Sequence, residues 1–286
     1  MKPALSDAPP AASASIARRP IAAPTGPGAA LGQFLAKTWA VTDMEVHKLL
    51  HDPFDIVTRA VQPILWLTVF GQVFGRLRAL PAGQGSYLDF LAPGILAQSV
   101  IYIAIFQGIA VIWERDQGTL QKFLVSPMPR GALVLGKGLA SGVRGLTQAI
   151  TIAVLALIMG VDLRLDPLAL LGVAALVMLG GNFFATLSLV IAALVRSRER
   201  VQGMGQLITM PLFFASNALY PIALMPGWVA VIAHLNPLSY MVDGLRELMI
   251  VGSPPGIGLR PDFGVLLLAN VIIVVLAARL YPNLVR

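Results

Sequence analysis

The sequence predicts an all-α integral membrane protein with six transmembrane helices, an N-terminal interfacial helix and a broken, re-entrant segment before the last span. Of its 286 residues, 57% are hydrophobic and only 12% are charged, and the mean hydropathy is +0.78. Soluble domains carry about a quarter charged residues, so this chain lacks the polar surface of a water-soluble globule. Its apolar runs lie along nearly the whole chain, and several approach the roughly 20 residues that cross a bilayer.

The chain begins with a segment, residues 1–30, that is rich in Ala, Pro, Ser and Gly and predicts a disordered cytoplasmic tail. Residues 31–286 are expected to form one transmembrane domain. In residues 31–50, Leu35, Trp39 and Val46 fall roughly on one helical face among charged residues, which is typical of a helix lying in the membrane interface. His47 and His51 have the spacing of two ligands, but no third ligand is nearby, so we expect no metal site.

Six spans are expected after this helix, because each run is mostly apolar and close to the required length. They are residues 54–74, 88–112, 139–159, 168–195, 206–222 and 263–281. Lys and Arg are concentrated in the connections on the side of the N-terminus, including Arg115, Lys122 and Arg130. By the positive-inside rule, both termini are expected on the cytoplasmic side of the inner cell membrane.

Residues 223–262, on the outer side, are broken by prolines, which end helices. Residues 228–235 suit a half-helix that enters the outer leaflet and returns. Asn236 and Pro237 predict the cap and first residue of another, amphipathic helix. The expected structural motif of this segment consists of Asn236, Pro237, Tyr240, Asp243 and Arg246.

The sequence contains no recognisable catalytic set, so we expect no catalytic residue and no enzyme activity in this chain. It has no cysteine, and its basic residues alternate with apolar runs rather than forming a track, which argues against nucleic-acid binding. Residues 131–138 resemble a phosphate-binding loop, but Gly138 follows Lys137 where a Ser or Thr would hold magnesium. We therefore expect no cofactor in this chain.

The polar side chains within or near the expected spans are mostly neutral. Ion-driven carriers, in contrast, place acidic and basic side chains there. The neutral side chains suit an apolar or amphipathic substrate, such as a drug-like molecule or a lipid. The substrate-path candidates are Gln98, Gln107, Gln148, Asn182, Ser216 and Asn217. Asn182 lies beside Gly180 and Gly181, and an interhelical hydrogen bond between closely packed helices is the favoured alternative for it.

The connection at residues 113–130 has the pattern of a short surface helix. Gly118 and Thr119 can end one helix and cap the next, and Leu120, Phe123 and Leu124 then share a face. From these residues alone, a docking helix for a cytoplasmic partner and an ordinary charged loop are equally compatible with the pattern.

Four runs together resemble the ABC type-2 exporter permeases, most closely the daunorubicin-resistance type. They are Tyr-Leu-Asp-Phe-Leu-Ala-Pro-Gly at 87–94, Glu-Arg-Asp-Gln-Gly-Thr-Leu at 114–120, Ser-Pro-Met-Pro-Arg at 126–130 and Leu-Asn-Pro-Leu-Ser-Tyr-Met-Val-Asp-Gly-Leu-Arg at 235–246. The resemblance covers residues 31–286, and the runs keep the family's order.

The resemblance implies a subunit with six spans after an interfacial helix. It implies a second, identical permease subunit and two copies of a separate ATP-binding cassette ATPase, which would hold ATP and magnesium. The loop after the second span would carry the coupling helix. The partner-coupling residues would be Glu114, Arg115, Gly118, Thr119, Leu120, Lys122, Phe123 and Leu124.

The expected function is therefore that of the permease subunit of an exporter driven by ATP hydrolysis in its partner. A self-sufficient secondary transporter or channel is the alternative, and buried ionisable residues or an internal repeat would favour it. A membrane-embedded enzyme would need a catalytic pair at span depth, which the sequence does not offer.

Overall fold

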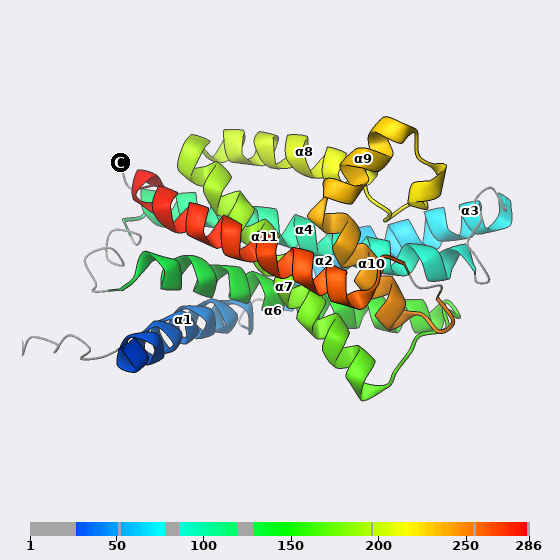
Figure 1. Cartoon of the computed structure of the whole chain (residues 1–286), viewed down its shortest axis with the longest axis horizontal. Coiled ribbons are helices and arrows are strands. Elements are labelled where there is room, and N and C mark those ends of the chain that lie inside the picture. The colour runs from blue at the N-terminus through cyan, green and yellow to red at the C-terminus, as the bar shows by residue number, and fades with distance from the viewer. Residues whose placement is uncertain are drawn as a thin grey trace, which may run out of the picture.

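The computed structural model describes residues 27–50, 53–77, 86–118, 128–195, 197–253 and 256–284. Within these ranges the chain is a bundle of long helices that run roughly side by side (Figure 1). The helices are α1 (Pro27–Leu50), α2 (Pro53–Leu65), α3 (Gly71–Leu77), α4 (Tyr87–Asp116), α6 (Arg130–Ile158), α7 (Pro167–Val195), α8 (Arg198–Phe214), α9 (Gly227–Leu235), α10 (Pro237–Met249) and α11 (Leu259–Leu280).

Four of the described helices are long and apolar enough to cross a membrane. They are α4, α6, α7 and α11, with mean hydropathies of 2.1, 1.5, 2.1 and 2.5 over their most apolar stretches. The predicted all-helical, membrane-protein class is confirmed. The two other expected spans are not single long helices: a π-helical turn, Trp66–Phe70, separates α2 from α3, and α8 has 17 residues.

Several helix bounds differ from those expected from the sequence. Residues 27–30 belong to α1 rather than to the tail, because Pro27 is compatible with the first turn of a helix. Helix α6 begins at Arg130 rather than at residue 139, and α8 begins at Arg198 rather than at residue 206 and ends at Phe214. Charged residues at these ends had suggested loops, but the helices continue through them.

Helix α7 lies at the centre and packs along α4, α6 and α11 (Figure 1). Small residues allow the close approach of α6: a Cβ atom at Gly138 would collide with Oδ1 of Asn182. Phe184, Leu176 and Ala185 of α7 are fully buried in the main core. Helix α1 packs on α6, and Val41 is 2% exposed at their contact.

Two helix starts have strong local signals. At α4, Oγ of Ser86 accepts a hydrogen bond from the Leu88 amide, and Oδ2 of Asp89 accepts one from the Ser86 amide, which forms a capping box. At α10, Oδ1 of Asn236 accepts from the Leu238 amide, and Pro237 is the first helical residue. The predicted Asn-Pro helix start is confirmed.

Helix α10 has apolar and polar residues on different sides, as expected, but its polar side is not exposed. Met241 and Leu245 are buried as expected, but Asp243 on the other side is only 8% exposed. Helix α10 packs against α4, α7 and α11, so both its apolar and its polar sides are covered by other helices.

Candidate functional site

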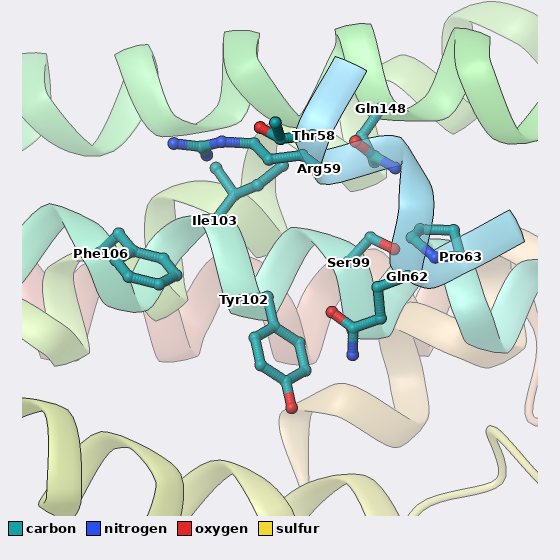
Figure 2. Close-up of a pocket in the computed structure, with 9 residues that line it drawn as sticks. All are labelled: Thr58, Arg59, Gln62, Pro63, Ser99, Tyr102, Ile103, Phe106 and Gln148. Atoms are coloured by element: carbon teal, nitrogen blue, oxygen red, sulfur yellow. The ribbon is translucent and has the colours of Figure 1, made fainter. Parts of the chain in front are cut away.

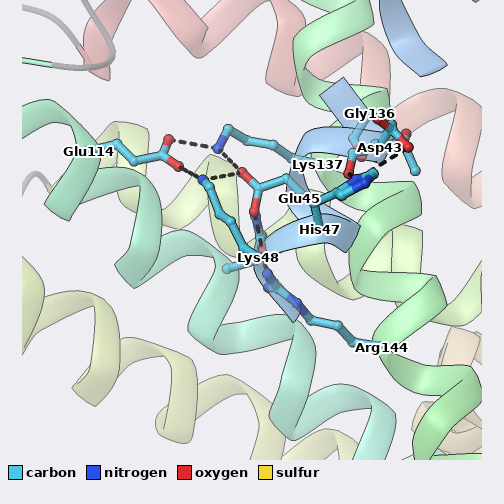
Figure 3. A network of polar contacts seen from close by, with 10 residues as sticks. Asp43, Glu45, His47, Lys48, Glu114, Gly136, Lys137 and Arg144 are labelled. Carbon is cyan, nitrogen blue, oxygen red and sulfur yellow. Dashed lines mark hydrogen bonds and ion pairs between the residues drawn. The ribbon is translucent and has the colours of Figure 1, made fainter. Parts of the chain in front are cut away.

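A buried ion-pair network joins three helices at the end of the bundle where α4 stops and α6 begins. We call this end the α4–α6 end. Its central residue is Lys137 of α6, whose side chain has no exposed surface. The ammonium group donates to Oε2 of Glu114 on α4 at 2.7 Å and to Oε1 of Glu45 on α1 at 3.1 Å (Figure 3). Lys137 therefore ties α1 and α4 to α6.

Two more cations complete the network. Lys48 lies one turn after Glu45 on α1, and its ammonium donates to Glu45 at 3.1 Å and to Glu114 at 3.3 Å. Arg144 of α6 lies 3.4 Å from Oε2 of Glu45 and donates to Oε1 of Gln107 on α4 at 2.9 Å. Two carboxylates thus face three cations, and Glu45 contacts all three of them (Figure 3).

The environment keeps both members of the α1 pair charged. Burial acts to raise the pKa of Glu45, but Lys137 and Lys48 outweigh it and hold that pKa below its usual value. For Lys48, burial acts to lower the pKa, but Glu45 and Glu114 raise it above its usual value. Breaking a buried pair leaves an uncompensated charge, so these helices resist separation at this point.

The network gives a structural role to Lys137, which lies in the run that resembles a phosphate-binding loop. Gly136 and Gly138 beside it permit close packing, since a Cβ atom at Gly136 would lie 2.6 Å from Val41 of α1. Sequence reasoning named Glu114 but not Glu45, Lys48, Lys137 or Arg144 as site residues. A charged residue inside an apolar helical run was the available signal, although the sequence alone could not show its partners.

The partner-coupling residues expected from the sequence lie next to the network or beyond the described part. Glu114 belongs to the network itself. Arg115 donates to Asp116 at 2.9 Å, and Asp116 accepts from Arg198 of α8 at 2.7 Å. Gly118 has a φ of +71°, in the left-handed region that suits glycine. Thr119, Leu120, Lys122, Phe123 and Leu124 lie outside the described residues.

The substrate-path candidates are buried but do not share one site. Gln107 is held by Arg144, and Asn182 donates to Oδ1 of Asn270 on α11 at 2.6 Å. Gln98 is 5% exposed and faces α8 beside Thr209. Gln148 lines a cavity between α2, α4 and α6. The hydrogen bond of Asn182 is the interhelical role that its neighbouring glycines had favoured.

The last two candidates lie with the α10 motif at the opposite end of the bundle. Ser216 donates to its neighbour Phe213, and Asn217 donates to Asp243 at 3.3 Å. Arg246 donates to the Asn217 carbonyl at 2.7 Å and stacks on the ring of Phe90.

The remaining members of that motif also make local contacts. Asn236 donates to the carbonyls of Leu212 and Ala215 at the end of α8, at 2.6 Å and 3.1 Å. Tyr240 donates to the His234 carbonyl at 2.7 Å. The motif thus fastens α8, α9 and α10 together, which is a structural task.

No group of three or more His, Cys, Asp or Glu side chains suited to a metal ion occurs within the described ranges. His47, one of the two histidines at ligand spacing, lies 3.4 Å from the carboxylate of Asp43 on its own helix, and its Nδ1 donates to the Asp43 carbonyl at 2.9 Å. The contacts of the site are therefore charge pairs between helices.

Comparison with known proteins gives a family match. The model of the family described as "ABC-2 type transporter" matches residues 36–250. A daunorubicin resistance ABC transporter permease protein of Streptomyces coeruleorubidus is 26% identical over 199 residues, covering 70% of this chain and 70% of that protein.

Two further relatives are similar over comparable lengths. Nodulation protein J of Rhizobium meliloti (strain 1021) is 27% identical, and the match covers 70% of this chain and 75% of that protein. The inner membrane transport permease YadH of Escherichia coli (strain K12) is 24% identical, and the match covers 74% of this chain and 81% of that protein.

Proposed function

This chain belongs to the ABC-2 type transporter family, and from that premise we propose that it is the membrane subunit of an exporter driven by a separate ATP-binding cassette ATPase. Two copies of that ATPase, holding ATP and magnesium, would dock at the α4–α6 end. A second, identical permease subunit would complete the membrane domain. The substrate would be amphipathic or hydrophobic, such as a drug-like molecule or a lipid.

The observation that carries this proposal is the position of the ion-pair network. Glu114 lies just before the connection expected to dock the ATPase, and Lys137 lies just after the start of the next helix. A force applied to that connection would reach α1, α4 and α6 together, because Lys137 bonds to both other helices. An ATP-driven transporter needs such a rigid joint between its partner and a bundle with two arrangements.

The membrane arrangement follows the same proposal. The α4–α6 end would face the cytoplasm of a cell with this protein in its inner membrane, as would both termini. The helical path from α2 to α3 and the stretch from α8 to residue 222 would be the two further spans, for six in all. Helix α9, whose Trp228 and Leu235 are 72% and 78% exposed, would enter the outer leaflet as the re-entrant piece.

The experiment is reconstitution with the cognate ATPase. In the variant carrying Leu120→Asp and Phe123→Asp, ATP-dependent transport is expected to disappear while the subunit still inserts into the membrane. A second exposed apolar pair outside the spans, Leu165→Asp with Val251→Asp in the α6–α7 and α10–α11 connections, serves as the matched control away from the coupling loop. Unchanged transport in the coupling variant would refute the docking assignment.

One observation favours the alternative, a self-sufficient ion-coupled carrier. Asp262 at the start of α11 is fully buried, and neither of its oxygens has a hydrogen-bond partner among the described residues. Asp243 and Glu247 lie close enough to repel its charge. Buried acids of this kind occur in proton relays, so Asp262 is the residue on which the two functions can be separated.

A further inference from the structure

A cavity of about 400 Å³ lies between α2, α4 and α6. Its volume falls within the roughly 300–1,000 Å³ typical of small-molecule sites. Helix α2 contributes polar side chains, because Thr58, Arg59 and Gln62 line the cavity (Figure 2). In an apolar run such as residues 54–74, a cation and an amide on one face would be costly against lipid, so this face is built for a polar occupant.

The opposite wall combines two hydroxyl groups with two aromatic rings. Ser99, Tyr102 and Phe106 recur at helical spacing on α4, and all three line the cavity (Figure 2). Phe106 is 52% exposed and forms the edge of the cavity. The wall therefore changes from polar inside to apolar at the edge, which matches a ligand with a polar head and an apolar tail.

Gln148 of α6 provides a group that lacks a partner. The side chain is 3% exposed, it lines the cavity, and its Nε2 donates to no atom of the described residues. A buried amide donor without a partner is unfavourable, because it has lost its hydrogen bonds to water, and an acceptor on a ligand would remove this cost. The cavity therefore contains a hydrogen-bond donor, Nε2 of Gln148, that an oxygen atom of a ligand could satisfy.

The charge of the lining residues favours a ligand whose polar head group is negatively charged. Arg59 is its one ionisable cation, and none of the lining residues is an Asp or a Glu. Arginine donates in a planar fork that matches carboxylate and phosphate oxygens. Gln62, Gln148 and the Tyr102 hydroxyl add donors that suit the same oxygens.

The cavity also adjoins the ion-pair network. Gln148 lies one helical turn after Arg144 on α6, and Phe106 precedes Gln107 on α4. Arg144 and Gln107 are hydrogen-bonded to each other at 2.9 Å. A ligand between α2, α4 and α6 would therefore press on the same two helices that the network holds.

We propose that this cavity binds the head group of an anionic amphiphile, with Arg59 and Gln148 on its phosphate or carboxylate oxygens and the tail leaving past Phe106. The inference rests on the proposed function, because it names the substrate class of the exporter. It narrows the expected apolar or amphipathic substrate to one with a negative head group. Arg59 and Gln148 are specificity-determining residues for that substrate.

The test measures binding to the full-length permease purified in an uncharged detergent, without the ATPase. The probes are a fluorescent short-chain phosphatidic acid, a phosphatidylcholine and a cationic amphiphile with the same chains, and inorganic phosphate as a competitor. We expect the phosphatidic acid to bind at least about tenfold more tightly than the other two amphiphiles. Inorganic phosphate should displace it poorly, since it lacks the tail.

Variants assign the site. Arg59→Gln should weaken phosphatidic acid binding about tenfold, and Arg59→Lys should retain part of it, since the charge remains. Gln148→Leu should weaken it less. Arg164→Gln, which changes a half-exposed arginine in a separate apolar crevice, should leave binding unchanged. An unaltered elution profile in size-exclusion chromatography shows that each variant is folded.

Three outcomes would overturn the proposal: equal affinity for all head groups, binding that Arg59→Gln does not weaken, or displacement by inorganic phosphate at the affinity of the lipid. Because the ATPase is absent, a failure here leaves the coupling assignment standing. Conversely, loss of ATP-dependent transport in the Leu120 and Phe123 variant, with anion binding intact, bears on coupling alone.

Discussion

The ammonium of Lys137 lies 2.7 Å from the carboxylate of Glu114, and Lys137 has no exposed surface. The two residues stand on either side of the connection between α4 and α6. Their ion pair links the ends of the two helices that this connection joins. Lys137 also bonds to Glu45, which links α1 to the same point. This joint is the structural basis of our proposal that the ATPase acts at this end of the bundle.

Removing the central cation should destabilise the bundle. Lys137→Met leaves the carboxylates of Glu45 and Glu114 buried with fewer partners, and we expect a loss of about 3 kcal/mol. Lys48→Met is the matched control, because its side chain is 51% exposed and an exposed pair contributes about 0–1 kcal/mol. Thermal unfolding of the two purified variants compares them. Equal losses would contradict the central role of Lys137.

Glu114→Gln should separate docking from transport. The amide keeps the size of the side chain but loses the charge that Lys137 and Lys48 need. We expect the ATPase to co-purify as before, while ATP-dependent transport falls at least about tenfold, because the joint no longer transmits its movement. Pull-down and vesicle transport on the same preparation give the two readouts. Full transport in this variant would show that the network is only structural.

Close packing at Gly138 gives a prediction independent of charge. Gly138→Ala should destabilise the protein by about 1–3 kcal/mol, since the new methyl group would collide with Asn182. Gly203→Ala on α8 is the control, because nothing lies within 4 Å of a Cβ atom there, and it should stabilise the helix by about 0.5–1 kcal/mol. Unfolding midpoints of both variants test the opposite signs.

The lowered pKa of Glu45 predicts how stability depends on acidity. A carboxylate whose pKa is depressed in the folded state stabilises it fully above the unfolded value of 4.5. That contribution is lost as the pH falls below 4.5 and through the folded pKa. Glu45→Gln should therefore reduce stability at neutral pH and flatten its decline in acid. A decline as steep as in the unaltered protein would mean that other carboxylates cause it.

Asp262 separates the two functional candidates. In the ATP-driven transporter, Asp262→Asn should leave transport nearly unchanged, because a neutral amide replaces a buried carboxyl that has no described hydrogen-bond partner. In an ion-coupled carrier the same change should abolish uphill transport. Transport by vesicles with and without a proton gradient distinguishes them.

The sequence predicted the helical class, the long apolar helices and the Asn236–Pro237 helix start, because composition and local capping determine these features. It did not predict that α8 would end at Phe214, since an apolar run continues beyond it. The residues of the candidate site were harder to predict from the sequence. Glu114 was named from a motif, whereas Glu45 and Arg144 are far from it in sequence and approach only when α1 and α6 pack together. Such pairings depend on tertiary structure.

The account is tested most directly by solute uptake into sealed vesicles that contain this chain alone or together with its ATP-binding cassette ATPase. We expect ATP-dependent uptake with both proteins, and neither uptake against a gradient nor ATP hydrolysis with this chain alone. Uphill transport or ATP cleavage by the solitary chain would contradict it.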